Sequence, residues 1–391
     1  MDRLLMRGGN IVDVTAGRIL SDRDLLISGE TIERIAEERI ESGFGSEIDA
    51  RGLWIIPGLI DAHVHMTGEA DPSLHHGKDP RMIFLEDDRL ALLRASKNLD
   101  SALRAGVTLL RDCGTQRGLS YILRMARALG AIRCPRLVVA GQLITGVGGH
   151  GVALGREAGT LDDAKAAIVA EVNNGADFIK IINDPIYYRR EVLSELVEFT
   201  HRLGRRVACH AYGSDSVRIA IDSGVDTIEH GSPFSESMAH AMINKGITLV
   251  PTYVAAAEST DPQLSLEDES MTEIMVNFLR ILRQNLPVAI KAGVRMATGT
   301  DAGFPPIKFT SVVDETIGFV ELGMRPIDAL RSATLIGAEI AGLSDSVGSI
   351  SKGKLADMVL LSGNPLEDVE ALRRPLLVMI GGEVIVNKTD S

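Results

Sequence analysis

Several features that define whole classes of protein are scarce or missing in this sequence. It contains three cysteines, Cys113, Cys134 and Cys209, an odd number without the spacing of a metal site. Each lies in or beside an apolar run, so we expect buried, reduced thiols rather than a disulfide framework, as suits a cytoplasmic protein. No apolar run approaches the roughly 18 residues that cross a membrane. Residues 1–4 lack the pattern of a signal peptide.

Positive charge is also in short supply. The chain has 41 lysines and arginines against 53 aspartates and glutamates, which gives a formal net charge of −12. This balance argues against nucleic acids and anionic membranes as partners. With 391 residues, of which 45% are hydrophobic and 24% charged, the chain has the composition of a globular protein with one large and one smaller domain.

Both ends of the chain have the sequence pattern of short antiparallel hairpins. In residues 1–56, β-branched runs alternate with turns such as Ser28-Gly29-Glu30, and the same pattern occurs again from residue 345. We predict that residues 1–56 and 345–391 pair into one small β-sandwich-like domain.

Residues 57–344 have a different sequence pattern, in which strand-like runs alternate with helical segments. We predict eight strands, at 59–65, 107–112, 136–144, 176–182, 206–211, 225–230, 247–251 and 294–301, and helices at 86–104, 117–129, 161–174, 189–203, 214–223, 235–245 and 271–292. Glycines such as Gly106 and Gly175 precede several strands and indicate helix C-caps. The predicted fold class is α/β, with a (β/α)8 TIM barrel. One or two more helices follow at 310–343.

The motif at residues 57–65, Pro-Gly-Leu-Ile-Asp-Ala-His-Val-His, carries the first chemical signal. Side chains alternate between the faces of a strand, so His63 and His65 point to the same side. Two imidazoles on one face at a strand end can bind one metal ion. The alternative is that both are structural histidines.

Residues of the same kind recur where other predicted strands end. In a parallel barrel these ends form the active face, so their side chains should converge. The residues concerned are His63, His65, Lys180, His210, His230 and Asp301.

Lys180 lies between isoleucines on a predicted central strand, where an unpaired charge would be costly. It could form a structural salt bridge, a Schiff base with a carbonyl substrate, or a carbamate with carbon dioxide. The carbamate is an anionic oxygen ligand that can bridge two metal ions. The surrounding histidines favour it, because an ammonium would repel the metal ions that they bind.

The order His-x-His, Lys, His, His, Asp resembles that of the amidohydrolase superfamily, in the branch with two metal ions. Residues 57–65 are similar to its opening motif, and 353–359 (Gly-Lys-Leu-Ala-Asp-Met-Val) to its return into the β domain. Further phrases look like the imidazolonepropionase-like group with Xaa-Pro and Xaa-Arg dipeptidases. They are 148–151 (Gly-Gly-His-Gly), 209–213 (Cys-His-Ala-Tyr-Gly), 228–231 (Ile-Glu-His-Gly) and 300–303 (Thr-Asp-Ala-Gly).

The resemblance implies a hydrolase that cleaves an amide bond with two divalent metal ions, which we expect to be zinc. The implied ligands are His63, His65 and Asp301 at the more buried ion, His210 and His230 at the other, and carboxylated Lys180 between them. A hydroxide shared by the metals would attack the substrate carbonyl. Asp301 would take its proton and pass it to the leaving amine.

Three further residues match positions that contact the substrate in the dipeptidases. His150 would polarise the carbonyl, unless it is a loop histidine without a role. Tyr212 and Arg218 would bind the substrate carboxylate, although Arg218 could equally be a solvated helix residue. Among the other histidines, the pair at 75–76 would lie nearest the pocket. The expected substrate is a small molecule, a dipeptide or an N-acyl amino acid, and the expected assembly is a homo-oligomer.

One segment departs from the dipeptidase pattern. Residues 183–188, Asn-Asp-Pro-Ile-Tyr-Tyr, replace a longer glycine-containing loop, so the pocket wall should differ. The alternative substrates are therefore a carbamate, a urea or an aryl amide. A deaminase or cyclic-ring hydrolase with one metal is disfavoured by Lys180 and by Gly213, where those enzymes often have a glutamate. A non-catalytic scaffold is disfavoured by the complete ligand set.

Overall fold

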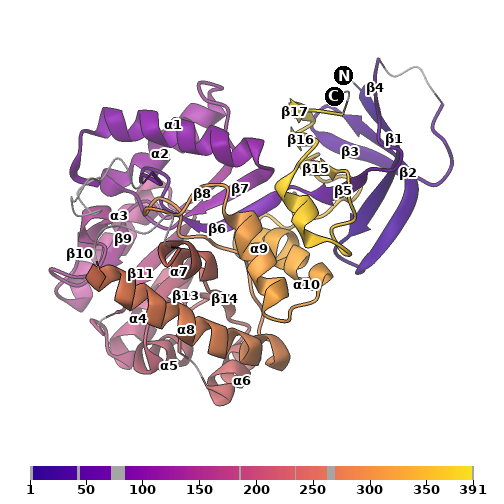
Figure 1. The fold of residues 1–391 in the computed structure, drawn as a ribbon. Coiled ribbons are helices and arrows are strands. Elements are labelled where there is room, and N and C mark those ends of the chain that lie inside the picture. Colours follow the sequence, from indigo (N-terminus) through magenta and orange to yellow (C-terminus); the bar gives the residue numbers. More distant parts are fainter. Residues whose placement is uncertain are drawn as a thin grey trace.

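The computed structural model shows a helix-rich body that continues at one side into a β-sheet, where both ends of the chain lie (Figure 1). The structure describes residues 3–41, 45–71, 84–184, 186–233, 235–261 and 269–389, with the side chains of 269–272 left out. His75 and His76, which we expected near the pocket, fall outside the described residues.

The lateral sheet combines strands from both ends of the chain in the order β17-β16-β15-β5-β1-β2-β3, with β4 beside β1. Its strands are β1 (Arg3–Asp13), β2 (Arg18–Ser28), β3 (Thr31–Ala36), β4 (Ser46–Asp49), β5 (Trp54–Pro57), β15 (Met358–Leu361), β16 (Leu377–Ile380) and β17 (Glu383–Asn387). The two ends meet where β15 runs antiparallel to β5, with Val359 opposite Ile56. Apolar side chains such as Ile11, Leu25 and Met358 are fully buried in this part.

This pairing of the two ends agrees with the expectation of one composite β structure. The hairpins β1–β2 and β2–β3 are antiparallel, as predicted. However, β4 and β5 pair with β1 in parallel, so the prediction of antiparallel hairpins throughout residues 1–56 was wrong for these two strands. Such register depends on partners distant in sequence, which a local pattern does not specify.

The strands of the body are parallel, which confirms a mixed α/β fold with parallel sheets. One sheet contains β6 (Leu59–Val64), β7 (Val107–Asp112) and β8 (Arg136–Val139). The other has the order β10 (Gly155–Glu157), β9 (Leu143–Thr145), β11 (Phe178–Ile182), β12 (Arg206–Ala211), β13 (Thr227–His230) and β14 (Thr248–Val250).

Two of the predicted strands differ from the structure. The predicted strand 136–144 is divided into β8 and β9, and Gly141 between them has a φ of +75° that a strand does not allow. The predicted strand 294–301 has single bridges only, Leu249 to Met296 and, just beyond, Val64 to Ala302. Its backbone N–H at Thr298 donates to Ser332 O outside the sheet, at 3.2 Å.

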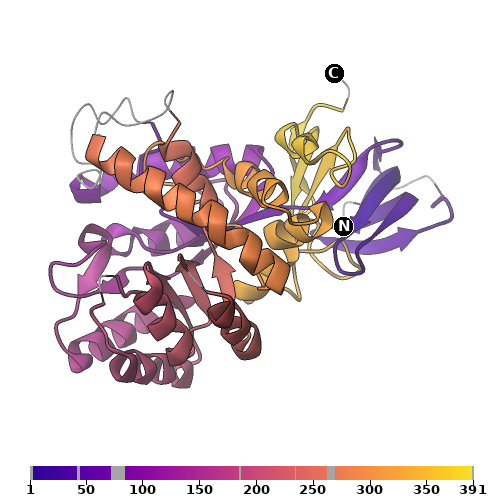
Figure 2. The ribbon, with the colours of Figure 1, turned by 60° about the horizontal axis from the view of Figure 1, so that its bottom comes forward.

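Helices cover the strands of the body (Figures 1 and 2). They are α1 (Asp88–Arg104), α2 (Leu119–Ala128), α3 (Leu161–Asn174), α4 (Arg190–Arg202), α5 (Ser214–Ser223), α6 (Glu236–Lys245), α7 (Tyr253–Ser259), α8 (Glu269–Ala292), α9 (Val312–Glu321), α10 (Pro326–Arg331) and α11 (Gly337–Ile340). Single turns occur at Gln116–Gly118, Val152–Leu154, Ser332–Ile336 and Val369–Arg373. The predicted C-cap Gly175 ends α3 with a φ of +95°.

The helix prediction has one omission. The short helix α7 was missed, because seven residues give little periodicity. Residues 310–343 contain two helical stretches, α9 and the unbroken run of α10, the turn Ser332–Ile336 and α11, in agreement with the one or two helices predicted. No helix in the described ranges is both long and apolar enough to cross a membrane.

Candidate active site

Four histidines form a contiguous cluster at the carboxyl ends of the parallel strands. The ring centroids of His63 and His230 are 5.1 Å apart, those of His63 and His65 are 5.5 Å apart, and those of His210 and His230 are 4.5 Å apart. Asp301 lies beside them, with Oδ1 at 3.4 Å from His63 Nε2 and 3.3 Å from His65 Nε2. These residues come from β6, β12, β13 and the segment after β14, so the predicted convergence is present.

His63 and His65 each use Nδ1 for a hydrogen bond, which leaves Nε2 on the other side of the ring free. His63 Nδ1 donates to Glu229 Oε2 at 2.7 Å, and His65 Nδ1 donates to Gly114 O at 2.8 Å. A proton on Nδ1 leaves the lone pair on Nε2, which is the form that binds a metal ion. His230 Nδ1 is hydrogen-bonded to the Thr252 hydroxyl at 2.7 Å. His63, His230 and Asp301 each offer one possible ligand atom, and these three atoms lie within 4.8 Å of one another.

The backbone around these ligands adopts conformations that non-glycine residues seldom have. His230 has a φ of +66° and Asp301 a φ of +63°. Such conformations cost energy and cluster at functional sites. Two glycines allow the segment before and after Asp301 to approach β6. A Cβ at Gly299 would lie 2.8 Å from His63 Cβ, and one at Gly303 would lie 2.1 Å from His65 O.

Burial favours the neutral form of the His63 and His230 imidazoles. It lowers the pKa of His63 to about 4, with the nearby Lys180 contributing further, and it holds the pKa of His230 well below its usual value. For Asp301, burial acts to raise the pKa, but the imidazoles of His63, His65 and His230 outweigh it, so the pKa lies well below the usual range. At neutral pH His63 and His230 therefore offer neutral nitrogens, and Asp301 offers an ionised carboxylate.

Lys180 has no obvious structural role in this site. Its side chain is 1% exposed, and within the described residues its Nζ has no hydrogen-bond partner, as is also true of Asp301 Oδ1. A buried ammonium without a partner is costly. Neutral imidazoles, a carboxylate and a lysine convertible to a carbamate form a donor set that suits divalent ions such as zinc. The residues present therefore fit a metal centre.

Sequence reasoning missed a buried ion pair behind this cluster. Glu229 on β13 accepts a hydrogen bond from Arg111 Nη1 at 3.1 Å as well as from His63, and Thr227 Oγ1 donates to it at 2.6 Å. The guanidinium of Arg111 lies 4.2 Å from the centre of the Phe178 ring. A charged residue inside a predicted parallel strand was the available signal at both positions, the same one that identified Lys180.

Two buried aspartates brace the strands that carry the ligands. Asp61 accepts hydrogen bonds from Thr300 Oγ1 at 2.6 Å and Thr300 N at 3.0 Å. Asp112 accepts one from Gly114 N at 3.1 Å, which places the carbonyl that holds His65. Burial raises the pKa of Asp61 to about 7 and that of Asp112 to about 6.

Of the three residues predicted to contact the substrate, the structure brings one to the histidine cluster. The His150 ring centre is 4.8 Å from that of His210, at the edge of the histidine cluster. Tyr212 follows β12 directly, is half-buried, and packs edge-on against Phe278 with ring centres 5.0 Å apart. Arg218 is exposed on α5. The structure thus brings His150 to the cluster, whereas the binding of a carboxylate by Tyr212 and Arg218 stays a prediction.

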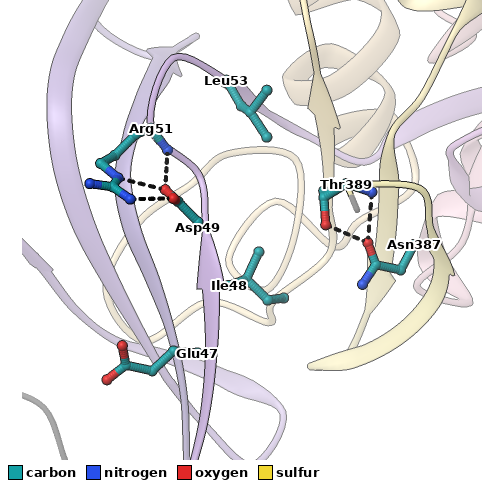
Figure 3. A pocket seen from close by; sticks show the side chains of 7 residues that line it. All are labelled: Glu47, Ile48, Asp49, Arg51, Leu53, Asn387 and Thr389. Carbon is teal, nitrogen blue, oxygen red and sulfur yellow. Dashed lines mark hydrogen bonds and ion pairs between the residues drawn. The ribbon is translucent and has the colours of Figure 1, made fainter. Parts of the chain in front are cut away.

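A separate hollow lies on the lateral sheet (Figure 3), lined by Glu47, Ile48, Asp49, Arg51, Leu53, Asn387 and Thr389. Its charged groups already have partners, since Arg51 Nε donates to Asp49 Oδ1 at 2.8 Å and Arg7 Nε donates to Glu47 Oε2 at 2.8 Å. Asn387 Oδ1 accepts from Thr389 N at 3.0 Å. The residues that line this hollow include no histidine, so they form no cluster comparable to the one at the strand ends of the body.

The parallel strands and the histidine–aspartate cluster at their ends define a hydrolase-type site, and the comparison with protein families agrees. The model of the amidohydrolase family matches residues 54–385. The chain therefore belongs to the amidohydrolase family.

Relatives within this family are enzymes with several different substrates. The solved structure of a Xaa-Pro dipeptidase with methionine bound in its active site is 28% identical, covers 98% of this chain and 99% of its own, and superimposes with a TM-score of 0.88. The ochratoxinase of Aspergillus niger is 25% identical over 369 residues, which are 83% of this chain and 73% of that one. The imidazolonepropionase of Micrococcus luteus is 24% identical over 377 residues, or 88% of each chain. The chain is accordingly an enzyme, a hydrolase of the amidohydrolase family, as the sequence indicated.

Proposed function

We propose that this enzyme is a metal-dependent hydrolase with two metal ions that cleaves the amide bond of a dipeptide or an N-acyl amino acid. The observation that carries the proposal is the buried Nζ of Lys180, which has no hydrogen-bond partner among the described residues and acts electrostatically on His63, His210 and His230. Similarity to the Xaa-Pro dipeptidase supports the substrate class. A cytoplasmic location and a homo-oligomeric assembly remain predictions.

We also propose that the two parallel sheets belong to one closed (β/α)8 barrel over residues 57–344, beside a β-sandwich-like domain formed by 1–56 and 345–391. Backbone hydrogen bonds at both junctions support it. Asp177 N donates to Val139 O at 2.9 Å between the two sheets. At the other junction, the segment 294–301 bonds to β14 through Ala297 N and Leu249 O and to β6 through Ala62 N and Thr298 O, both at 2.9 Å.

The proposed ligands divide into two groups around the lysine. His63, His65 and Asp301 would hold the more buried ion, and His210 and His230 would hold the other. We propose that Lys180 is shared by the two groups. When bound, two divalent ions supply Lewis acidity and lower the pKa of a bound water to about 7. For Lys180 to serve, its amine adds to carbon dioxide, so that an N–C bond forms, a proton leaves and a carbamate remains.

The other residues act on the substrate and its protons. Asp301 is ionised at neutral pH, so its carboxylate can accept a proton and later return it to the leaving amine. His150, beside His210, is suited to donate a hydrogen bond to the carbonyl oxygen as charge develops on it. Tyr212 and Arg218 are proposed to bind the substrate carboxylate.

A second substrate class is favoured by the aromatic side chains beside His65. The ring centre of Phe304 lies 5.1 Å from that of His65 and 5.1 Å from that of Phe84. Phe84 is buried, but Phe304 is partly exposed and offers apolar ring surface beside His65. An aryl amide, a carbamate or a urea could pack there and be cleaved by the same metal site.

Rates of hydrolysis across a library of compounds distinguish between these two substrate classes. The library contains free dipeptides, N-acyl amino acids, and aryl amides, carbamates and ureas without a carboxylate, all assayed with the metal-replete protein. We expect the highest kcat/KM among dipeptides or N-acyl amino acids. The proposal fails if the compounds without a carboxylate are cleaved best, or if no compound is cleaved.

We predict that the purified, unchelated protein contains about two divalent ions per chain, most of them zinc. The reason is the number of ligand-type residues, which exceeds the four of one tetrahedral zinc site. Elemental analysis by mass spectrometry measures the content. A reproducible value of one or less after reconstitution with zinc and bicarbonate would contradict a site for two metals.

We further predict that capping the substrate carboxylate as an amide lowers kcat/KM about ten- to a hundredfold, since a charge-assisted contact is worth about 1.5–3 kcal/mol. Arg218→Met should cause a similar loss on the free acid and little additional loss on the amide, because both changes remove one contact. Equal activity on free and capped substrates, with Arg218→Met silent on both, would exclude the carboxylate contact.

A further inference from the structure

The segment that departs from the dipeptidase pattern places a carboxylate at the edge of the histidine cluster. Asp184 Oδ2 lies 3.8 Å from His210 Nε2, and the Asp184 side chain is 33% exposed. His150 is also next to His210, with its ring centre 4.8 Å from that of His210. Asp184 therefore borders the space in which the substrate carbonyl would meet His150 and the metal site.

This carboxylate differs from its neighbours in having no strong internal partner. Three other carboxylates of the site are hydrogen-bonded, as described above: Asp61 to Thr300, Asp112 to backbone N–H groups, and Glu229 to Arg111 and His63. The fourth, Asp301, faces His63 and His65 inside the cluster. Within the described part of the chain, Asp184 forms no ion pair with a lysine or arginine, and its Oδ2 lies 3.8 Å from Nε2 of His210. Its negative charge is open to a cation from solvent.

The backbone that carries Asp184 is held in place. Asn183 N donates to His210 O at 3.0 Å, which continues the pairing of β11 with β12. The Asn183 side chain exchanges two hydrogen bonds with the Tyr188 backbone, at 2.8 and 3.1 Å, and Ser216 Oγ donates to Asn183 O at 2.6 Å. Fixed anchoring of this kind positions a side chain for recognition without a large ordering cost on binding.

We propose that Asp184 binds the α-ammonium group of the substrate's first residue, and that the enzyme therefore prefers free dipeptides to N-acyl amino acids. This inference rests on the proposed function. In a dipeptide the ammonium nitrogen is separated from the scissile carbonyl carbon by the α-carbon alone, so it reaches a group at the edge of the carbonyl site. The α-amino group is largely protonated at pH 7, with a usual pKa of about 7.7–8.0. An acylated or desamino substrate has no such charge and leaves Asp184 unpaired.

The test compares an alanyl amino acid with its propionyl counterpart, which differs only by the loss of the ammonium group. We expect the wild-type enzyme to prefer the alanyl substrate about ten- to a hundredfold in kcat/KM, the range of a charge-assisted contact. Asp184→Asn should remove this preference by lowering the rate on the alanyl substrate, while its rate on the propionyl substrate and its metal content stay at the wild-type level. Retained activity on the propionyl substrate also shows that the variant is folded.

Asp222→Asn is the matched control, since it makes the same change on the exposed side of α5 at the helix end remote from Tyr212. It should leave both rates unchanged. The inference is overturned if the wild type cleaves both substrates without preference, or if Asp184→Asn lowers both rates equally together with the metal content, which would make Asp184 a metal ligand. If the metal-replete wild type cleaves neither substrate nor any other library compound, the proposed function fails and this inference fails with it.

Discussion

Replacing Asp301 by asparagine should remove most of the turnover while leaving substantial metal in the protein. The amide keeps an oxygen that can face His63 and His65, but it cannot accept the proton that hydrolysis releases. Loss of a general acid–base group typically costs a factor of about 100 to 10,000, so kcat should fall by at least a hundredfold. The measurement is kcat at saturating substrate, with the metal content of the same preparation determined in parallel.

The structure gives this prediction a specific control. Asp301 is the carboxylate whose Oδ1 faces His63 and His65, whereas Asp222 carries the same group on the exposed surface of α5. Asp222→Asn should therefore keep its activity. Near-normal turnover in Asp301→Asn would exclude it as the proton carrier. Loss of turnover with loss of both metals would assign it to metal binding alone.

Replacing Lys180 by methionine should separate the roles of this buried lysine. Methionine is apolar and of similar length, but it cannot form a carbamate, so the bridge between the two proposed ions is lost. Metal ions supply several kcal/mol of transition-state stabilisation, which corresponds to a loss of about a thousandfold in kcat/KM. At the same time at least one of the two ions should be lost from the purified protein.

A second readout tests the state of Lys180 without turnover. The buried Nζ has no hydrogen-bond partner among the described residues, and burying an amine without a partner is unfavourable for folding. Metal-free Lys180→Met should therefore unfold at a higher temperature than metal-free wild type, whereas with zinc and bicarbonate the order should reverse. Lys97→Met, at an exposed position of α1, is the control and should change neither property. Full metal content and activity in Lys180→Met would rule out the carbamate.

The positions of the proposed ligands were accessible from sequence because each depends on a short local pattern. The alternation in β6 places His63 and His65 on one face, and the parallel order of the units brings β12 and β13 to the same end of the sheet. A lysine between isoleucines on β11 was recognisable without any contact. These features need only the period of a strand and the direction of its neighbours.

The segment after β14 shows where such reasoning fails. Its apolar pattern indicated a strand at 294–301, yet Thr298 and Thr300 direct their hydroxyls to Ile60 O and Asp61 Oδ2 on β6, at 2.8 and 2.6 Å. These side-chain bonds add to the backbone bonds that join the segment to β6 and β14, which form single bridges rather than a regular ladder. The same arrangement leaves Asp301 with a φ of +63° among the histidines.

By itself the sequence determined which side chains reach the active end of the strands, since strand period and chain order suffice for that. Tertiary structure alone decided how the imidazoles are held. The partner of His63 Nδ1, Glu229, lies 166 residues away, that of His65 lies 49 residues away, and that of His230 lies 22 residues away. A hydrogen bond of fixed length requires both groups to be placed by packing, so no local pattern could have specified which nitrogen would be free to bind a metal.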